Sequence, residues 1–321
     1  MKKVYIYMSL KNRIKGVNFS VETFHLNTKF RNDYYKTPST KCTIPMKETK
    51  KFQAVRLSQI CLPNSWYVFS NLLENNYFIV QMEKEGSDNM EILEIVIPEG
   101  NYTADELETY LNTTYFADSE RIYGFRKIRF TINKHTLKSQ FSLIDCSIES
   151  TLKFDIIFVR ENTPTLMTTC GWILGFRYGK YYNIRDEIYS EGLYDGGGDR
   201  YVYFCLTNTE LENAKTVHVI SLDNKVESTD STHVLSKIYL NNGKFSININ
   251  EDVDNEFTFN KSLILGKDTT LTKGLDIKIL DQYGQEIYLN NMDFSFTLEF
   301  INIESSSGGL EGGEIENKND Y

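Results

Sequence analysis

The stretch 274–303 alternates apolar and polar residues in three short segments, and this pattern limits the fold more than any other part of the chain. Every second position is apolar in 275–279, 287–289 and 294–300. A period of two puts one face of a pleated strand on a core and the other in water, whereas a helix would spread the same residues around its surface. Gly284, in the turn DQYG, is free to take a positive φ. We expect three antiparallel strands here, at the rim of a sheet that closes on strands from elsewhere in the chain.

Similar strand patterns recur along the chain. They lie at 22–28, 52–62, 77–80, 92–97, 128–132, 141–143, 152–158, 171–176, 201–206, 217–220, 234–240, 245–249 and 257–259. Asn242-Gly243 separates two of these segments, and Asn-Gly is the strongest short signal for a hairpin, so 234–240 and 245–249 are expected to pair. The segments 29–51 and 178–200 read as long loops. About a dozen strands indicate a sandwich or a jelly roll.

One helix is predicted, after Thr103. Thr103 is a good N-cap, Glu106 three residues later completes a capping box, and Tyr102 and Leu107 occupy the hydrophobic-staple positions. The apolar residues that follow share one helical face: Leu107, Tyr110, Leu111 and Tyr115. We expect this helix to lie across a sheet and, with the hairpin after it, to form an insertion near 99–146.

The fold class expected from these patterns is all-β, an antiparallel jelly-roll sandwich with that small helix-plus-hairpin insertion. The 321 residues, 40% hydrophobic and 13% aromatic, are enough for one large core or two smaller ones. We expect an N-terminal arm at 1–20, a jelly-roll domain at 21–303, and a flexible acidic, Gly/Ser-rich tail at 304–321. The alternative is two β-domains divided near 178–200.

The net charge of −9 argues against a protein whose main role is to coat nucleic acid. Within the arm, Lys11, Arg13 and Lys15 form a small basic cluster. Such a cluster is either a solvated terminus or a contact with an acidic neighbour or packaged nucleic acid. No apolar run approaches the length of a membrane span, and the basic start of the chain has no pattern of a secretion signal, so we expect neither.

Side chains that could carry chemistry are scattered. The five cysteines, at 42, 61, 146, 170 and 205, have no CxxC spacing and are expected to be reduced and mostly buried. His25, His135, His218 and His233 have no partner at metal-ligand spacing. The acidic run at 251–256 lacks the glycine and the final glutamate of a calcium loop. Asp195 and Asp199 flank three glycines, which favours a mobile loop over a carboxylate pair. We therefore assign no catalytic, metal-binding or cofactor-binding residue, and no cofactor.

Three groups of segments, in order along the chain, carry a resemblance to a known family. The first is KFQAVRLSQICLPNSWYVFSN followed by NNYFIV. The second is IVIPEGNYTADELETYLNT with IRFTINKHTLKSQFSL, TLKFDI and GWILGF, and the third is LDIKILDQYGQEIYLNNMDFSFTLEF. In this order they resemble the penton and minor capsid proteins of large eukaryotic double-stranded DNA viruses, virophages and Polinton-like elements. The resemblance covers residues 50–303.

This resemblance implies a jelly-roll building block of a capsid, without catalysis. Penton proteins of the family form five-fold rings at vertices, and minor capsid proteins bridge or underpin the lattice of the major capsid protein. The expected partners are therefore copies of this chain, as a pentamer if it is a penton, together with the major capsid protein and other minor capsid proteins. The expected location is the virion, after synthesis in the host cytoplasm.

Two other function classes remain open from the residues alone. A spike or attachment protein would use the same sandwich to grip a receptor or glycan, with Trp66 and Trp172 either as stacking platforms or as core residues. A hydrolase on a jelly-roll scaffold would need clustered carboxylates or histidines in a cleft, and the sequence shows no such cluster.

Overall fold

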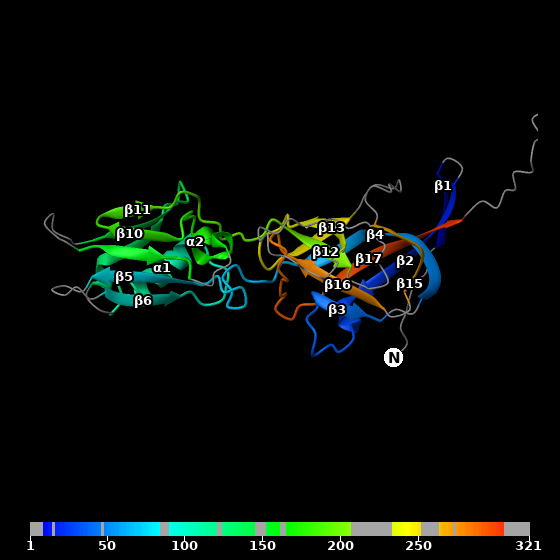
Figure 1. Cartoon of the computed structure of the whole chain (residues 1–321), viewed down its shortest axis with the longest axis horizontal. Helices are drawn as coiled ribbons and strands as arrows, with labels where there is room; N and C mark the ends of the chain where they lie inside the picture. Colours follow the sequence, from blue (N-terminus) through cyan, green and yellow to red (C-terminus); the bar gives the residue numbers. More distant parts are fainter. Residues whose placement is uncertain are drawn as a thin grey trace, which may run out of the picture.

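The fold consists of antiparallel strands packed as sandwiches, with few short helices, which confirms the predicted all-β class. The computed structural model describes residues 9–14, 17–45, 48–83, 90–120, 124–144, 152–160, 165–206, 233–251, 263–271 and 274–304. Figure 1 shows two bodies arranged along the long axis of the molecule. Among the described residues, no helix has the length and apolar character needed to cross a membrane.

The body that contains both ends of the described chain is called the first sandwich. Its larger sheet has the order β1-β2-β17-β4-β14, with β15 also paired to β4. The strands are β1 (Ser9–Ile14), β2 (Val17–Asn27), β17 (Ser295–Glu304), β4 (Glu48–Pro63), β14 (Ile247–Glu251) and β15 (Leu263–Leu271). The facing sheet has the order β13-β12-β16-β3. Its strands are β13 (His233–Tyr239), β12 (Tyr201–Leu206), β16 (Leu275–Leu280) and β3 (Lys41–Ile44).

The core of the first sandwich explains why the 294–300 pattern was so regular. β17 lies between β2 and β4, so alternate side chains point into the space between the two sheets. The Phe300 ring lies 5.3 Å from that of Phe24 and 4.9 Å from that of Phe52, centroid to centroid. Strands from both ends of the sequence therefore share one apolar cluster.

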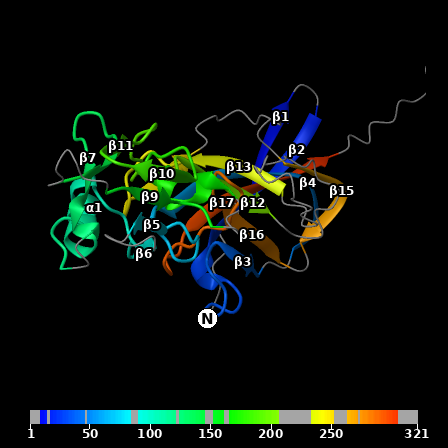
Figure 2. The same ribbon diagram turned by 60° about the vertical axis from the view of Figure 1, so that its left-hand side comes forward.

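The second body, the second sandwich, is built from the middle of the chain. One sheet has the order β10-β9-β5-β6 and the other β11-β8-β7. The strands are β10 (Lys180–Ile184), β9 (Phe154–Ile157), β5 (Tyr77–Glu83), β6 (Met90–Val96), β11 (Glu187–Tyr189), β8 (Ser139–Leu143) and β7 (Ile128–Ile132). The helices are α1 (Ala104–Thr114) and the short α2 (Cys170–Ile173). Figures 1 and 2 together place α1 and β7 behind the sheet that contains β5 and β6.

The predicted helix is confirmed in detail. Thr103 accepts a hydrogen bond from the Glu106 backbone, and the Glu106 carboxylate accepts one from the Thr103 backbone, so the capping box is complete. Leu107 and Leu111 are fully buried in the core of the second sandwich. The helix with its following hairpin, β7 and β8, thus shares a core with strands on both sides of it in sequence.

Three local predictions are corrected by the structure. Residues 287–289 form no strand, because β16 and β17 lie in opposite sheets and the chain between them crosses the sandwich. Asn242-Gly243 does not make a hairpin: β13 pairs β12 and β14 pairs β4. The Asn242 N–H donates instead to the side chain of Asn248, 3.0 Å away, which organises a wider loop.

The third correction concerns 171–176, which contains the end of α2 rather than a strand. Gly171 allows the helix to lie against a ring of the core, since a Cβ there would come within 2.4 Å of Phe158. Gly175 then reverses the chain with φ +93°.

Several segments that were expected to be irregular are partly regular. The loop predicted at 178–200 holds β10 and β11, and the one at 29–51 holds β3 and the start of β4. Residues 9–14, in the expected arm, form β1 and pair with β2. The strands predicted at 217–220 and 257–259, residues 1–8 and the tail beyond residue 304 lie outside the described residues.

The two cores share no residue. Trp66 and Val202 belong to the first core, and Val68 and Tyr194 belong to the second. Within the described residues, the chain therefore passes between the sandwiches twice, at 66–68 and at 194–202. The division into folding domains remains a proposal.

Candidate functional site

A cavity of about 110 Å³ lies at the junction where these two crossings meet. The first sandwich and the crossings line it with Trp66, Tyr67, Val68, Asp195, Gly198, Asp199, Lys244, Asp281, Gln282, Tyr283 and Gln285. The second sandwich lines it with Leu73, Asn75, Met167, Thr168, Trp172 and Ile173. The cavity thus joins polar groups of one sandwich to a largely apolar wall of the other.

Trp66 is the centre of the polar side. Its ring is buried in the first core, and its indole Nε1 donates to Asp199 Oδ2 at 3.0 Å. The ammonium of Lys244, from the loop between β13 and β14, lies 4.4 Å from the centre of the Trp66 ring and donates to the Trp66 carbonyl at 3.2 Å. Burial lowers the pKa of Lys244 to about 8. Trp66 therefore links a carboxylate and an ammonium that are both largely removed from water.

Asp281 follows β16 and belongs to the same polar group. Its Oδ1 accepts hydrogen bonds from the backbone N–H groups of Tyr283 and Gln285, both at 2.8 Å, which folds the DQYG turn. Gly284 takes φ +82° there, as the sequence predicted. Burial, with a further contribution from the nearby Asp199, raises the pKa of Asp281 to about 7. Burial also raises the pKa of Asp199. Asp199 and Asp281, which are distant in sequence, thus line one cavity, and the charge of Asp199 contributes to the raised pKa of Asp281.

The glycine-rich crossing at 195–200 is closely packed. Gly198 has φ +71°, which favours glycine, and a Cβ there would lie 3.0 Å from Val68 and 3.2 Å from Lys244, so these side chains would have to shift. The Asp195 N–H donates to the Ile173 carbonyl of the second sandwich at 2.8 Å. The Asp195 carboxylate is exposed and pairs with Arg200. Asp195 and Asp199 therefore have different hydrogen-bond and ion-pair partners, although the charge of Asp195 contributes to the raised pKa of Asp199. A third carboxylate, Asp281, lines the same cavity, which sequence spacing could not reveal.

The tryptophans do not form an exposed platform. Trp66 is buried, and Trp172 is partly buried, with the guanidinium of Arg177 lying 3.9 Å from its ring centre. The two rings considered as stacking platforms for a glycan are thus packed against protein groups.

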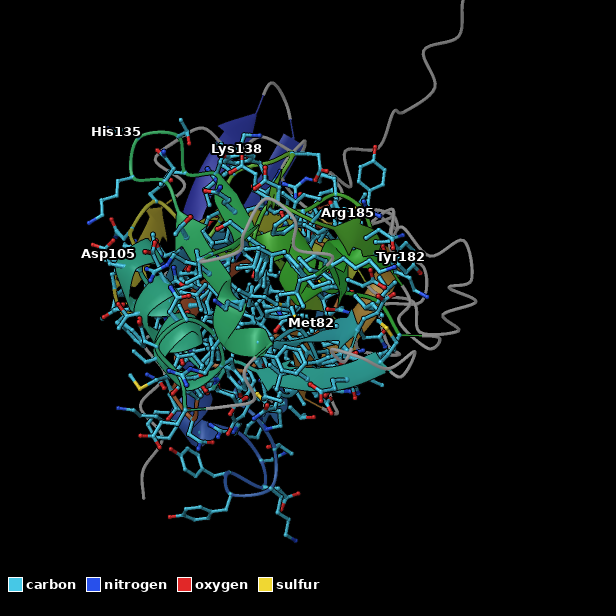
Figure 3. The ribbon with its side chains drawn as sticks, turned by 90° about the vertical axis from the view of Figure 1, so that its left-hand side faces the viewer. Met82, Asp105, His135, Lys138, Tyr182 and Arg185 are labelled. Carbon is cyan, nitrogen blue, oxygen red and sulfur yellow. The ribbon has the colours of Figure 1, made fainter. Side chains whose placement is uncertain are left out.

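The histidines and cysteines show no common site. His25 Nδ1 lies 2.9 Å from Thr297 Oγ1 on the outer face of the larger sheet. His135 lies in the exposed turn between β7 and β8, at the edge of the second sandwich in Figure 3. The side chains of His218 and His233, and Cys146, lie outside the described part. In the part of the chain that the structure describes, no group of three His, Cys, Asp or Glu side chains could hold a metal ion.

The described cysteines are free thiols, at 42, 61, 170 and 205. Burial raises the pKa of Cys42 and Cys205 to about 12, and burial also raises the pKa of Cys170. Such thiols stay protonated near neutral pH and are poor nucleophiles. Of the acidic run 251–256, only Glu251, the last residue of β14, lies in the described part.

A second feature is an aromatic loop, residues 28–40, that projects from the first sandwich next to β3 (Figure 1). Tyr35 is 97% exposed and Phe30 is 65% exposed. The loop is held from inside by Arg31, whose guanidinium donates to the carbonyls at 28, 34 and 37 and to the Asp293 carboxylate. Tyr34 donates to the same carboxylate at 3.0 Å. Large rings are thus presented to solvent on a fixed backbone.

A third feature is the outer face of the sheet β10-β9-β5-β6, here called the open sheet face. Inward side chains of β5 alternate with outward ones, and the strand register places the outward ones beside those of β6 and β9. The outward residues are of both kinds: the apolar ones are Tyr77, Ile79, Met90, Ile92, Val96 and Ile157, and the polar ones are Gln81, Glu83, Glu94 and Asp155. Ile92 is 64% exposed, and β6 is an edge strand. Arg160 pairs with Glu94 on this face and lies 3.8 Å from the centre of the Tyr77 ring. Exposed apolar residues such as Ile92 among these polar groups can mark a contact with another molecule.

Comparisons with known proteins give a structural likeness and no sequence match. No family model matches the chain, and no curated protein matches it. Among solved structures it is similar to the mavirus penton protein, with TM-score 0.45 and 13% identity, over 90% of this chain and 100% of that one. Pneumolysin is also matched, with TM-score 0.12 and 10% identity, over 95% of this chain and 70% of that one. The mavirus protein is a penton protein, the class that the sequence resembles.

Proposed function

We propose that this chain is a structural capsid protein of a large double-stranded DNA virus, a penton or a minor capsid subunit, that acts by association with copies of itself and with the major capsid protein. The ordered series of sequence segments motivates the family. Its location would then be the virion capsid, and it would act without catalysis or cofactor. The observation that carries the proposal is the aromatic loop, because exposed rings on a preorganised backbone are typical centres of protein interfaces.

In this proposal, the molecule that the aromatic loop contacts is a second copy of the chain. The loop exposes Lys29, Lys36 and Asp33, so its surface is slightly basic, whereas the whole chain has a net charge of −9. A basic, aromatic surface is therefore complementary to the average surface of another copy. The open sheet face lies on the other sandwich and is a different surface, and we propose that the aromatic loop of one copy contacts the open sheet face of the next. A contact between two different surfaces is heterologous, and a series of such contacts closes into a ring when the rotation between neighbouring copies permits.

Native mass measurement of the purified protein tests this proposal. We expect a closed ring, five-fold if the chain is a penton. The double variant Phe30→Ser/Tyr35→Ser and the single variant Ile92→Ser should each break the ring, since loss of an anchoring side chain costs on the order of 2 kcal/mol or more per contact. Leu72→Ser is the matched control, because Leu72 is 67% exposed and lies outside both surfaces.

Mixing the two kinds of variant sharpens the test. In a heterologous ring each variant keeps one intact surface, so the mixture should form a dimer with a single good interface and nothing larger. A wild-type protein that stays monomeric at high concentration, or its absence from the shell of purified particles, would overturn the proposal. Binding on a glycan array by that monomer would favour the attachment role instead.

A further inference from the structure

The junction cavity contains ionisable groups that association of subunits does not explain. Asp199, on the crossing at 194–202, and Asp281, which follows β16, line one largely buried cavity where the two crossings of the described chain meet. We propose that this junction is a pH-dependent latch: the two sandwiches are held together more tightly as the pH falls below neutrality, and the junction opens more readily as the pH rises towards 7 to 8.

The geometry couples the carboxylates to the contact between the sandwiches. Asp199 accepts from Trp66, and its crossing is fixed to the second sandwich by the hydrogen bond from Asp195 to the Ile173 carbonyl. Across the cavity stand Met167, Thr168 and Trp172 of the second sandwich. Separating the sandwiches would admit water to both carboxylates, so their protonation and the closure of the junction must be linked.

The charges that face these carboxylates come almost entirely from one side. Lys244 lies on the Trp66 ring, and Tyr283, whose pKa is raised by burial and by the carboxylates, stays neutral near pH 7. The part of the second sandwich that lines the cavity contributes no ionisable group. Asp195, which pairs with Arg200, contributes to the raised pKa of Asp199, and Tyr67 also lines the cavity. Nearby, Arg177 covers Trp172. Closure therefore removes both carboxylates from water and offers them one buried ammonium.

The sign of the pH dependence follows from Asp281. In the closed junction its pKa is about 7, above the ordinary value of about 4 for a solvated aspartate. The closed form thus binds a proton more tightly than the open form, and closure is favoured below about pH 4 and loses this advantage as the pH rises to 7. The raised pKa of Asp199 acts in the same direction.

Lys244 acts in a different range. Its pKa in the closed junction is about 8, below the ordinary value for lysine, so closure is penalised wherever the ammonium is charged. That penalty is constant from pH 5 to 7 and is relieved only above about 8. The change between pH 5 and 7 is therefore due to the carboxylates, and the junction should be loosest near pH 7 to 8.

Hydrogen exchange on the full chain tests the latch, with rates corrected for the intrinsic pH dependence of exchange. The reporting amides are those of Asp195 and Asp281, which donate to the carbonyls of Ile173 and Gln285. We expect their protection factors to fall between pH 5 and 7, by up to about tenfold per pH unit for one linked proton. Amides inside β5 and β12 should show no such fall. A pH-independent protection of the junction in the wild-type protein would overturn the proposal.

Asp281→Asn removes the carboxylate charge but keeps the turn, because the amide oxygen can still accept hydrogen bonds from the backbone N–H groups of Tyr283 and Gln285. This variant should be more protected than wild type at pH 7 and should lose most of the pH slope. Asp105→Asn, at an exposed carboxylate of α1 that does not line the cavity, should keep the wild-type slope. An Asp281→Asn protein with an unchanged slope would contradict the latch. If that variant folds poorly, Asp199→Asn and the wild-type profile remain decisive.

Discussion

The guanidinium of Arg31 and the carboxylate of Asp293 form an ion pair with Nη1 2.5 Å from Oδ1, although both side chains are almost fully buried, at 5% and 7% exposure. The pair joins the aromatic loop to the segment that leads into β17. Because Asp293 also accepts from Thr28 and Tyr34, one carboxylate fixes three points of the loop. Buried ion pairs contribute little net stability, but they penalise every conformation that separates the charges.

Asp293→Ala should therefore be strongly destabilising. The change leaves the Arg31 guanidinium buried without its counter-charge, which costs about 3–5 kcal/mol in typical buried pairs. Urea unfolding measures the effect. The control is Asp105→Ala, which removes the partner of Lys134 in a largely exposed pair and should cost under about 1 kcal/mol. An Asp293→Ala protein as stable as this control would show that the pair does not hold the loop.

The capping box of α1 permits a local prediction. Thr103→Ala removes the side-chain acceptor for the Glu106 N–H and should destabilise the protein by about 0.5–2 kcal/mol. Chemical denaturation measures the loss. Thr109→Ala is the control, because Thr109 lies exposed in the middle of the same helix, where alanine is a favourable residue. Equal losses in the two variants would mean that the cap contributes nothing of its own.

Elements set by local chemistry were predicted well from the sequence. The capping box depends on residues three positions apart, alternation placed β7, β8, β9, β16 and β17, and short apolar runs placed β5 and β12. Gly284 was placed correctly because the DQYG turn uses only neighbouring residues. These signals share one property: the stabilising partners lie within a few residues of each other or on one face of one element.

Features that depend on distant partners were not predictable in this way. Asn242-Gly243 favours a hairpin when only local residues are considered. In the structure β14 pairs with β4 instead, and the Asn242 N–H donates to the side chain of Asn248. The same applies to the junction. No residue near Asp199 in sequence indicates that Asp281 lies on the same cavity. Trp66 has the sequence pattern of an ordinary core aromatic residue, and only the structure shows that its indole donates to Asp199.

Asn112 gives a prediction for the contact between α1 and β7. Its amide donates to the Phe130 carbonyl at 2.7 Å and accepts from the Phe130 N–H at 3.0 Å, and all of these groups are buried. Asn112→Ala should cost about 1–3 kcal/mol for each backbone group left without a partner. Hydrogen exchange at Phe130 should accelerate together with the loss of stability. The neighbouring Thr113→Ala, which removes only the hydrogen bonds to the carbonyls of Thr109 and Tyr110 in its own helix, should change little.

The separate cores lead us to propose that the sandwiches unfold as two units. Phe141, in the second core, lies 4.8 Å from the ring of Phe130 and packs against further rings of that sandwich only. Phe300 does the same in the first core. Each Phe→Ala change should cost about 3–5 kcal/mol, because it leaves a cavity among aromatic rings. That cost falls on one core, since mutational effects are nearly additive when no partner is shared.

Differential scanning calorimetry of the full chain measures this independence. We expect two overlapping transitions, with Phe141→Ala lowering the midpoint of one and Phe300→Ala lowering the midpoint of the other. In limited proteolysis, release of the second sandwich requires a cut at both crossings, 66–68 and 194–202, and the released fragment should keep its β-sheet circular dichroism. A single transition, lowered equally by both variants, would mean that the two cores fold as one cooperative unit and that the chain has one domain with an elaborated middle.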